Sequence, residues 1–267
     1  MYGTMQNCSF YLAEGYQIFR GLLPHATVLG VRDYLQGAME RTLRDFAHFG
    51  LDPTDLIASS RVAQHVVATQ PELDVATRIT LMGHFPLRDR LARELWAIPR
   101  EPALRAVLSE ALKSERLFMH MPPTARFILP GNAAAGVPPH QDISYNRHMP
   151  SFVVLWVPLV DIDMQCGGMA VYQGTKDLPA QQATVNRDGW LSPIDVSGYK
   201  RIECQPMSLG DCILFGPHLA HGSMPNMSQR VRLSIDFRFF ADGTSGKHAL
   251  DMQTWQVLDP VPPAING

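Results

Sequence analysis

The sequence is poor in cysteine, and the cysteines it has are scattered. The 267-residue chain contains four of them, Cys8, Cys166, Cys204 and Cys212, and none belongs to a C-x-x-C pair. Zinc sites built on cysteine use such closely spaced pairs, so we do not expect cysteine ligation of zinc. Disulfide frameworks are typical of short secreted chains. The pattern indicates reduced thiols and predicts a cytoplasmic protein.

The sequence also lacks long apolar runs and a large excess of charge of one sign. No stretch approaches the length of a membrane span, and the first ten residues contain no basic segment followed by an apolar one. The net charge is −2, which indicates no basic surface for nucleic acid or for an acidic membrane. We therefore expect neither partner, and the composition says nothing about the oligomeric state.

The chain is long and apolar enough, at 46% hydrophobic residues, to form one domain over residues 1–267. Apolar residues at three- and four-residue steps predict an amphipathic helix over 25–49. Further helices are predicted near 72–83, 87–98 and 102–114. Short apolar or alternating runs predict strands, namely 117–120, 125–129, 151–160, 169–172, a short one within 210–217 and 230–240.

This order of elements predicts a mainly β fold with N-terminal helices. We expect a helical flank over about 1–115, a core over about 116–240 and a C-terminal extension over 241–267. Helices followed by many short strands with Gly/Pro turns favour a double-stranded β-helix, a jelly-roll or cupin-like core flanked by α-helices. The polar segment 179–200 could be a lid over a site, or an ordinary exposed connection.

A candidate metal site comes from His140, Asp142 and His221. Residues i and i+2 of a strand point to the same face, so His140 and Asp142 could bind one metal from one side. His221 follows 81 positions later and must come from another strand. Two imidazoles and one carboxylate form the facial triad of non-haem Fe(II) oxygenases. In a chain with ten histidines, the triplet alone would equally fit a solvated loop histidine.

The predicted strand 230–240 has one apolar and one polar face. The residues of the polar face are Arg230, Arg232, Ser234, Asp236 and Arg238. A solvent-facing strand would give the same pattern, but this one closely follows the candidate ligand His221. A guanidinium is suited to pair with the carboxylate of a dicarboxylate bound to the metal. Arg230 and Arg232 share a face, so alternation cannot choose between them.

Several longer stretches together resemble a known family. They are PPHQD at 138–142, VVLWVPLVD at 153–161, CGGMAVYQGTK at 166–176 and GDCILFGPHLAHGSMPNMSQRVRLS at 210–234. In this order they resemble the phytanoyl-CoA dioxygenase (PhyH) family of Fe(II)/2-oxoglutarate-dependent oxygenases, over about residues 10–240. The resemblance implies an oxidoreductase that uses Fe(II), 2-oxoglutarate and O2 to hydroxylate or otherwise oxidise a small molecule, with formation of succinate and CO2.

The resemblance also implies roles for individual residues. It implies that His140, Asp142 and His221 bind the iron and form the catalytic centre. Arg232, eleven positions after His221, matches the arginine that pairs with the distal carboxylate of 2-oxoglutarate. Three residues match positions that often line the co-substrate pocket, namely Gln141, Trp156 and Ser223. Apart from the resemblance, Tyr145 and Arg147 are candidates for substrate contact because they follow the H-x-D motif and loops beside a site often carry recognition, although surface polarity alone would also explain them.

The sequence departs from the family pattern at 173–176, where Gln-Gly-Thr-Lys replaces the common Pro-Gly-Ser-His. Asp142 is informative because related halogenases carry a small residue there, so a carboxylate favours hydroxylation or a related oxidation. His218 forms an H-x-x-H pair with His221, but we expect that His218, like His120 and His148, does not bind the metal.

Two alternative functions remain: a non-catalytic small-molecule-binding jelly roll, and a cupin-type metalloenzyme that does not use 2-oxoglutarate.

Overall fold

A computed structural model describes residues 8–149, 151–181, 192–241 and 246–260. The α-helices are α1 Ser9–Glu14, α2 His25–Asp45, α3 Leu56–Thr69, α4 Val75–Leu81, α5 Leu87–Arg90 and α6 Pro102–Leu112. The 3-10 helices are η1 Ala47–Phe49, η2 Arg93–Arg100, η3 Ala133–Ala135 and η4 Asp142–Ser144. Within the described residues, no helix combines the length and apolar character that a membrane crossing requires.

Strands dominate the chain after residue 117. They are β1 Tyr16–Phe19, β2 Phe118–His120, β3 Thr124–Ile128, β4 Val153–Pro158, β5 Met169–Gln173, β6 Lys200–Glu203, β7 Cys212–Phe215, β8 His221–Ser223, β9 Arg232–Phe240, β10 Ala249–Asp251 and β11 Gln256–Leu258. All pairings between them are antiparallel. The predicted order of helices first and short strands later is confirmed, although β1 lies within the N-terminal part.

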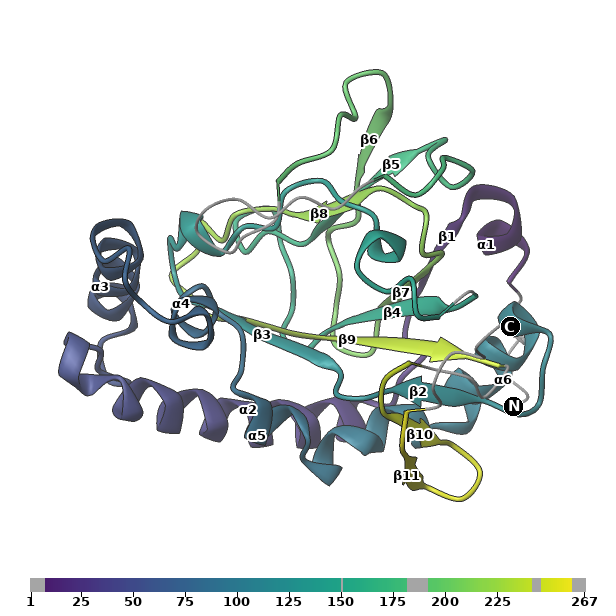
Figure 1. Ribbon diagram of the computed structural model, residues 1–267, viewed down its shortest axis with the longest axis horizontal. Coiled ribbons are helices and arrows are strands. Elements are labelled where there is room, and N and C mark those ends of the chain that lie inside the picture. The colour runs from purple at the N-terminus through teal and green to yellow at the C-terminus, as the bar shows by residue number, and fades with distance from the viewer. Residues whose placement is uncertain (1–7, 150, 182–191, 242–245, 261–267) are drawn as a thin grey trace, which may run out of the picture.

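The strands form two sheets. The larger has the order β1-β7-β4-β9-β2-β10-β11, with β3 also paired to β9, and the smaller has the order β6-β5-β8. In Figure 1, α2 runs below the large sheet and the small sheet lies above it. The large sheet is therefore covered on both faces, by helices on one side and by the small sheet on the other.

Strand β4 shows why its sequence is apolar at almost every position. Val153, Leu155 and Val157 belong to the buried cluster that contains the helices. Val154 and Trp156 point the other way, into the cluster between the two sheets. A strand buried on both faces has no reason to alternate between polar and apolar residues. The continuous apolar run over 151–160 is explained by this position.

The N-terminal helices follow the predictions in part. The predicted helix 25–49 divides into α2 and η1, and Gly50 ends η1 in the left-handed region at φ 95°. Helix α3 was not predicted. Its buried face is formed by Ser59, Ser60, Ala63 and Val66, so the apolar periodicity is weak. The Asp55 carboxylate caps this helix by accepting a hydrogen bond from the backbone N–H of Ala58 at 2.9 Å.

Gly83 joins α4 to the sheet under tight constraints. Its φ is +90°, and an added Cβ would lie 2.4 Å from the Phe127 carbonyl oxygen. The Gly83 carbonyl accepts a hydrogen bond from the Phe127 backbone N–H at 2.8 Å, so the chain cannot move away easily. The next residue, His84, bridges to Arg126 of β3. Gly83 thus allows the helical region to approach β3 closely.

We predict that Gly83→Ala destabilises the fold more than Gly21→Ala. Both positions have positive φ, but an added Cβ at Gly21 would have no neighbour within 4 Å. Gly21→Ala should cost about 1–2 kcal/mol for the left-handed backbone alone. Gly83→Ala should cost about 1–3 kcal/mol more because of the clash. Urea unfolding of the two variants measures the difference, and equal free energies of unfolding would contradict it.

Candidate metal centre

The two predicted histidine ligands are held next to each other by the backbone. The N–H of His140 donates to the carbonyl of His221 at 2.9 Å, and the N–H of His221 donates to the carbonyl of His140 at 3.0 Å. Residues paired in this way across antiparallel chains point their side chains to the same face. Their imidazole centroids consequently lie 4.2 Å apart.

Asp142 joins the histidines by a route that the sequence did not predict. His140 forms only an isolated bridge, and Asp142 is the first residue of η4, so the two do not lie on one strand. The expected same-face strand spacing is therefore wrong. A 3-10 turn, held by a hydrogen bond from Asn146 Nδ2 to the Asp142 carbonyl at 2.9 Å, directs the carboxylate instead. Ligand atoms of the three residues all lie within 4.8 Å of one another.

Both histidines present the same nitrogen to the site. His140 Nδ1 lies 2.9 Å from the Pro138 carbonyl, and His221 Nδ1 lies 3.0 Å from the Leu219 carbonyl. A carbonyl accepts only from a protonated nitrogen, so each Nε2 keeps its lone pair for a ligand. Burial, reinforced by His221, lowers the pKa of His140 to about 3, and burial also lowers the pKa of His221. Both rings are therefore neutral at neutral pH.

The Asp142 carboxylate is ionised, and only one of its two oxygens accepts a hydrogen bond. Burial alone would raise its pKa, but Arg238 and the two imidazoles outweigh burial and lower the pKa to about 2. Arg238 Nη2 donates to Oδ1 at 3.1 Å, whereas Oδ2 is buried without a hydrogen-bond partner. A buried anionic oxygen without a partner is costly unless a ligand completes it. Two neutral imidazole nitrogens and this carboxylate fit a divalent transition metal with open coordination positions.

A cavity of about 390 Å³ opens onto these three residues. The polar face of β9 forms one wall of it through Arg232, Ser234, Asp236 and Arg238. The opposite face of β9 packs into the helical core through Leu233, Ile235, Phe237 and Phe239. The alternation seen in the sequence is confirmed, and the polar face is an internal cavity wall rather than a surface exposed to solvent.

Arg232 is almost fully buried in this wall, with 2% of its surface exposed. Its Nη1 donates to the carbonyls of Gly167 at 2.6 Å and Met224 at 2.8 Å. Burial lowers its pKa to about 10, so it stays charged at neutral pH. Among the described residues no carboxylate forms an ion pair with Arg232, and its Nε has no hydrogen-bond partner. A buried cation that no carboxylate contacts directly, although Asp236 on the same wall acts on it at longer range, is suited to bind an anionic group.

Arg230 has a different environment from Arg232. It precedes β9, half of its side chain is exposed, and its Nη2 pairs with Asp163 Oδ2 at 2.7 Å. It is not among the residues that line the cavity. The structure therefore separates two arginines that alternation in the sequence placed on one face.

The remaining candidates divide between the cavity and its surroundings. Ser223, Trp156 and Tyr145 line the cavity. Gln141 does not line it, because Nε2 donates to the His218 carbonyl at 2.8 Å and Oε1 accepts from the Gln181 backbone N–H at 2.9 Å. Gln141 is thus committed to holding loops together rather than to the co-substrate pocket.

Arg147 is also outside the cavity. Its side chain is exposed to solvent, so the expected substrate contact is not supported by its position. Residues 182–191, which form the middle of the suggested lid 179–200, lie outside the described residues.

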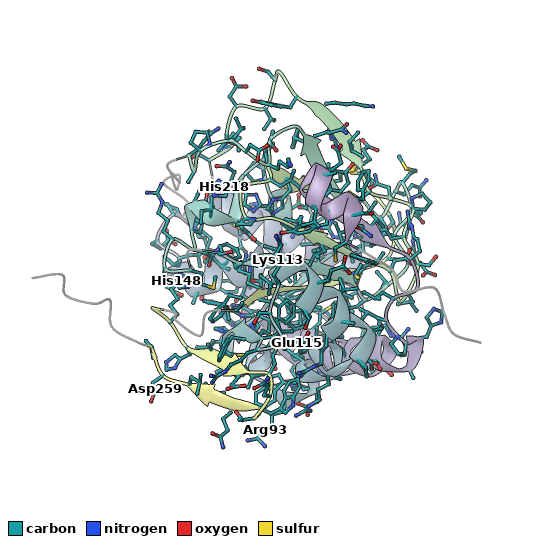
Figure 2. All side chains as sticks on the ribbon, turned by 90° about the vertical axis from the view of Figure 1, so that its right-hand side faces the viewer. Arg93, Lys113, Glu115, His148, His218 and Asp259 are labelled. Atoms are coloured by element: carbon teal, nitrogen blue, oxygen red, sulfur yellow. The ribbon has the colours of Figure 1, made fainter. Side chains whose placement is uncertain are left out.

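The other histidines near the motif are not part of the metal cluster. His218 Nδ1 lies 2.8 Å from the Leu178 carbonyl, and His218 is absent from the group of three converging ligands. The rings of His120 and His148 pack at 5.2 Å, and neither lines the cavity. Figure 2 shows His218 well above His148 on the left side of the view.

Several cavity residues escaped the sequence analysis. Arg238 and Asp236 belonged to the recognised polar face, but no role was given to them. Arg126 of β3 donates from Nη2 to the Ala135 carbonyl at 2.6 Å, and His84 and Arg90 come from the helical region. No pattern in the sequence connects those three to the metal motif, because only tertiary packing brings them to one cavity.

Two antiparallel sheets around a buried His-Asp-His cluster place this protein among β-rich proteins with a candidate mononuclear metal centre. Its sequence makes the assignment more specific. The chain belongs to the phytanoyl-CoA dioxygenase (PhyH) family, whose model matches residues 13–234.

Individual relatives are more distant. The chain is 26% identical over 112 residues to 1-deoxypentalenic acid 11-beta-hydroxylase from Streptomyces arenae, a match covering 38% of this chain and 40% of that relative's length. The structure resembles EvdO2 from Micromonospora carbonacea var. aurantiaca complexed with 2-oxoglutarate, with a TM-score of 0.64, 18% identity, and coverage of 98% of this chain and 97% of that one.

A third relative is the epimerase SnoN, solved in complex with Fe3+, alpha ketoglutarate and nogalamycin RO. Its TM-score is 0.58 at 16% identity, with coverage of 91% of this chain and 84% of SnoN. At these identities EvdO2 and SnoN show a shared fold.

We predict that the removal of any one ligand side chain weakens metal binding strongly. His140→Ala, Asp142→Ala and His221→Ala should each lower Fe(II) affinity by about a hundredfold or more, because each removes one of three protein ligands. His218→Ala is the matched control and should bind Fe(II) like the wild type. Anaerobic titration calorimetry measures all four. Loss of binding in His218→Ala, with retention in His221→Ala, would show that the wrong histidine was chosen.

We predict that His140 makes the stability of the metal-free protein depend on pH. Its pKa is about 3 when folded and about 6.5 when unfolded, so the unfolded chain takes up the proton first. Its stabilising contribution is complete above pH 6.5 and is lost as the pH falls toward 3. His140→Gln should reduce this slope by about 1.4 kcal/mol per pH unit. Urea unfolding at several pH values measures it. The exposed His65→Gln is the control, and equal slopes in wild type and His140→Gln would contradict the prediction.

Proposed function

We propose that this protein is an Fe(II)/2-oxoglutarate-dependent dioxygenase. It hydroxylates or otherwise oxidises a small-molecule metabolite or natural-product intermediate and forms succinate and CO2. The observation that carries the proposal is that Arg232, a buried arginine with no direct ion pair among the described residues, lines the same cavity as a complete His-Asp-His triad. Membership of the PhyH family supports the same reaction class.

The iron would be held by Nε2 of His140 and His221 and by the carboxylate of Asp142. The chain delivers these groups in the required protonation state, since both imidazoles are neutral and the carboxylate is ionised. Metal binding would therefore displace no proton from the three ligands at neutral pH. When bound, Fe(II) with 2-oxoglutarate and O2 supplies the oxidising chemistry.

Arg232 would bind the distal carboxylate of 2-oxoglutarate. The carbonyls of Gly167 and Met224 already hold its guanidinium by Nη1, which reduces the conformational freedom lost when the co-substrate binds. The side chains of Ser223 and Trp156 line the same cavity and would contact the co-substrate between the metal and Arg232. Gly167 must lack a Cβ, because one would lie 2.1 Å from the Pro225 carbonyl oxygen.

The carboxylate at position 142 favours hydroxylation or a related oxidation over halogenation, because it occupies the metal position that a halide would need. The activities of two relatives differ, since one is a hydroxylase and another an epimerase. We therefore propose the reaction only as the oxidation of a small molecule.

The broader proposals follow from the same features. The two antiparallel sheets would form a double-stranded β-helix core within one domain over 1–267. The buried thiols of all four cysteines are free, which fits the proposed cytoplasmic location.

The two alternatives make different predictions for 2-oxoglutarate. A non-catalytic binding protein would form no succinate, and a cupin-type metalloenzyme would not require the co-substrate. Purified protein supplied with Fe(II), ascorbate and 2-oxoglutarate should form succinate, and His221→Ala should not. Failure of the wild type to bind 2-oxoglutarate in the presence of Fe(II) would reject the proposed function, whereas slow succinate formation without a primary substrate would support it.

We predict that Arg232→Ala raises the apparent KM for 2-oxoglutarate about thirtyfold or more, whereas Arg230→Ala changes it little. A charge-assisted pair in a buried site contributes about 2–5 kcal/mol, and each 1.4 kcal/mol is tenfold. Arg232→Lys should restore only part of the affinity, because a point charge replaces a planar fork. Succinate formation at varied 2-oxoglutarate concentration gives the three KM values. A large rise in Arg230→Ala alone would transfer the role to Arg230.

A further inference from the structure

The cavity carries more positive charge than the metal and co-substrate require. Among the described residues, four arginines but only two aspartates line it, namely Arg90, Arg126, Arg232 and Arg238 against Asp142 and Asp236. A divalent metal and a 2-oxoglutarate dianion would balance each other. The excess positive charge of the arginines would therefore remain after the metal and 2-oxoglutarate had bound. A further anion bound in the cavity would neutralise it.

Two of the four arginines lie at the end of the cavity away from Arg232. Arg238 lies six residues after Arg232 on β9, which corresponds to about 20 Å along a strand. Its Nη1 donates to Thr124 Oγ1 at 3.3 Å, and Arg90 Nη1 makes a long contact of 3.5 Å with the carbonyl of the preceding residue, Pro123. Two arginines from different elements thus lie beside one short segment of chain.

Of these two arginines, Arg90 is the more available to pair with a bound anion. Arg238 already pairs with Asp142, whereas among the described residues no carboxylate forms an ion pair with Arg90. Arg90 Nε is buried and has no hydrogen-bond partner. Burial lowers the pKa of Arg90, and the neighbouring charge of Arg238 lowers it further, so an anion near both guanidinium groups would stabilise their charged forms.

We propose that Arg90 and Arg238 recognise a carboxylate on the primary substrate, with the Thr124 hydroxyl as a further polar contact. This inference rests on the proposed function, because it assumes that 2-oxoglutarate occupies the Arg232 end. The substrate is then a small organic acid bound between the metal and the Arg90 end. The carboxylate sets its orientation, and the carbon that is oxidised lies toward His140 and His221.

The test uses three carboxylates as probes, each with its neutral amide: acetate, cyclohexanecarboxylate and decanoate. The full chain is loaded anaerobically with Fe(II) and saturating 2-oxoglutarate, so that the Arg232 end is occupied, and probe binding is measured by calorimetry. At least one carboxylate should bind about tenfold or more tightly than its amide, as expected for charge-assisted hydrogen bonds. If no carboxylate binds better than its amide, the proposal is overturned.

Arg90→Gln is the informative variant, because no hydrogen bond or ion pair within the described part of the chain joins Arg90 to a metal ligand or to Arg232. It should weaken carboxylate binding about tenfold or more, leave amide binding unchanged, and leave the affinities for Fe(II) and 2-oxoglutarate as in the wild type. Arg90→Lys should restore part of the loss, and Arg230→Gln, outside the cavity, should change nothing. Unchanged carboxylate binding in Arg90→Gln would overturn the proposal.

Inorganic phosphate is titrated in the same way. If phosphate binds more tightly than every carboxylate, and this binding is lost in Arg90→Gln, the group recognised on the substrate is a phosphate and not a carboxylate.

Failure of the proposed function is distinguishable from these results. If wild-type protein does not bind 2-oxoglutarate with Fe(II), the dioxygenase proposal fails. The binding of each carboxylate and its amide is then compared on protein that contains neither Fe(II) nor 2-oxoglutarate. Dependence on Arg90 under those conditions would still support an acid-binding site.

Discussion

The reciprocal backbone hydrogen bonds between His140 and His221 are the contact on which the candidate centre depends. They join two segments 81 residues apart and bring both imidazoles to one face. Each ring is then oriented by a carbonyl two residues earlier in its own chain segment. The third ligand, the cavity and the arginines are all arranged around this pair. Gly222, which follows His221, permits the close approach, since an added Cβ would lie 2.8 Å from the Val137 carbonyl oxygen.

Strand β9 connects the centre to the rest of the fold. One face packs with the helices through four large apolar side chains, and the other presents Arg232, Ser234, Asp236 and Arg238 to the cavity. The stability of the core and the charge of the cavity are thus properties of the same nine residues. Because the apolar face sets the register of β9, it also sets the positions of the arginines on the other face.

Much of this could be predicted from local patterns. The alternation over 230–240, the apolar run that became β4 and the three candidate ligands were recognisable because strand periodicity and ligand chemistry are local properties. Helix α3 was missed because small residues such as Ser59 and Ala63 form its buried face. The turn at Asp142 was mistaken for a strand because H-x-D spacing suits both. Strand alternation could not choose between Arg230 and Arg232, whereas the spacing from His221 in the family resemblance selected Arg232, which lines the cavity. The presence of Arg90 in the cavity depends on tertiary packing that no spacing encodes.

The attachment of Asp142 to a 3-10 turn has a consequence for how such sites can diverge. The two histidines are positioned by backbone hydrogen bonds between residues 140 and 221, which any residue other than proline could form. The carboxylate instead belongs to a short turn outside the named strands, bound by Asn146 and by the carbonyl of Pro217 through Ile143. A change of the anionic ligand would therefore leave the backbone pairing of residues 140 and 221 intact. The scaffold thus separates two neutral ligands, which are joined to each other through the backbone, from a third ligand that is held by a turn.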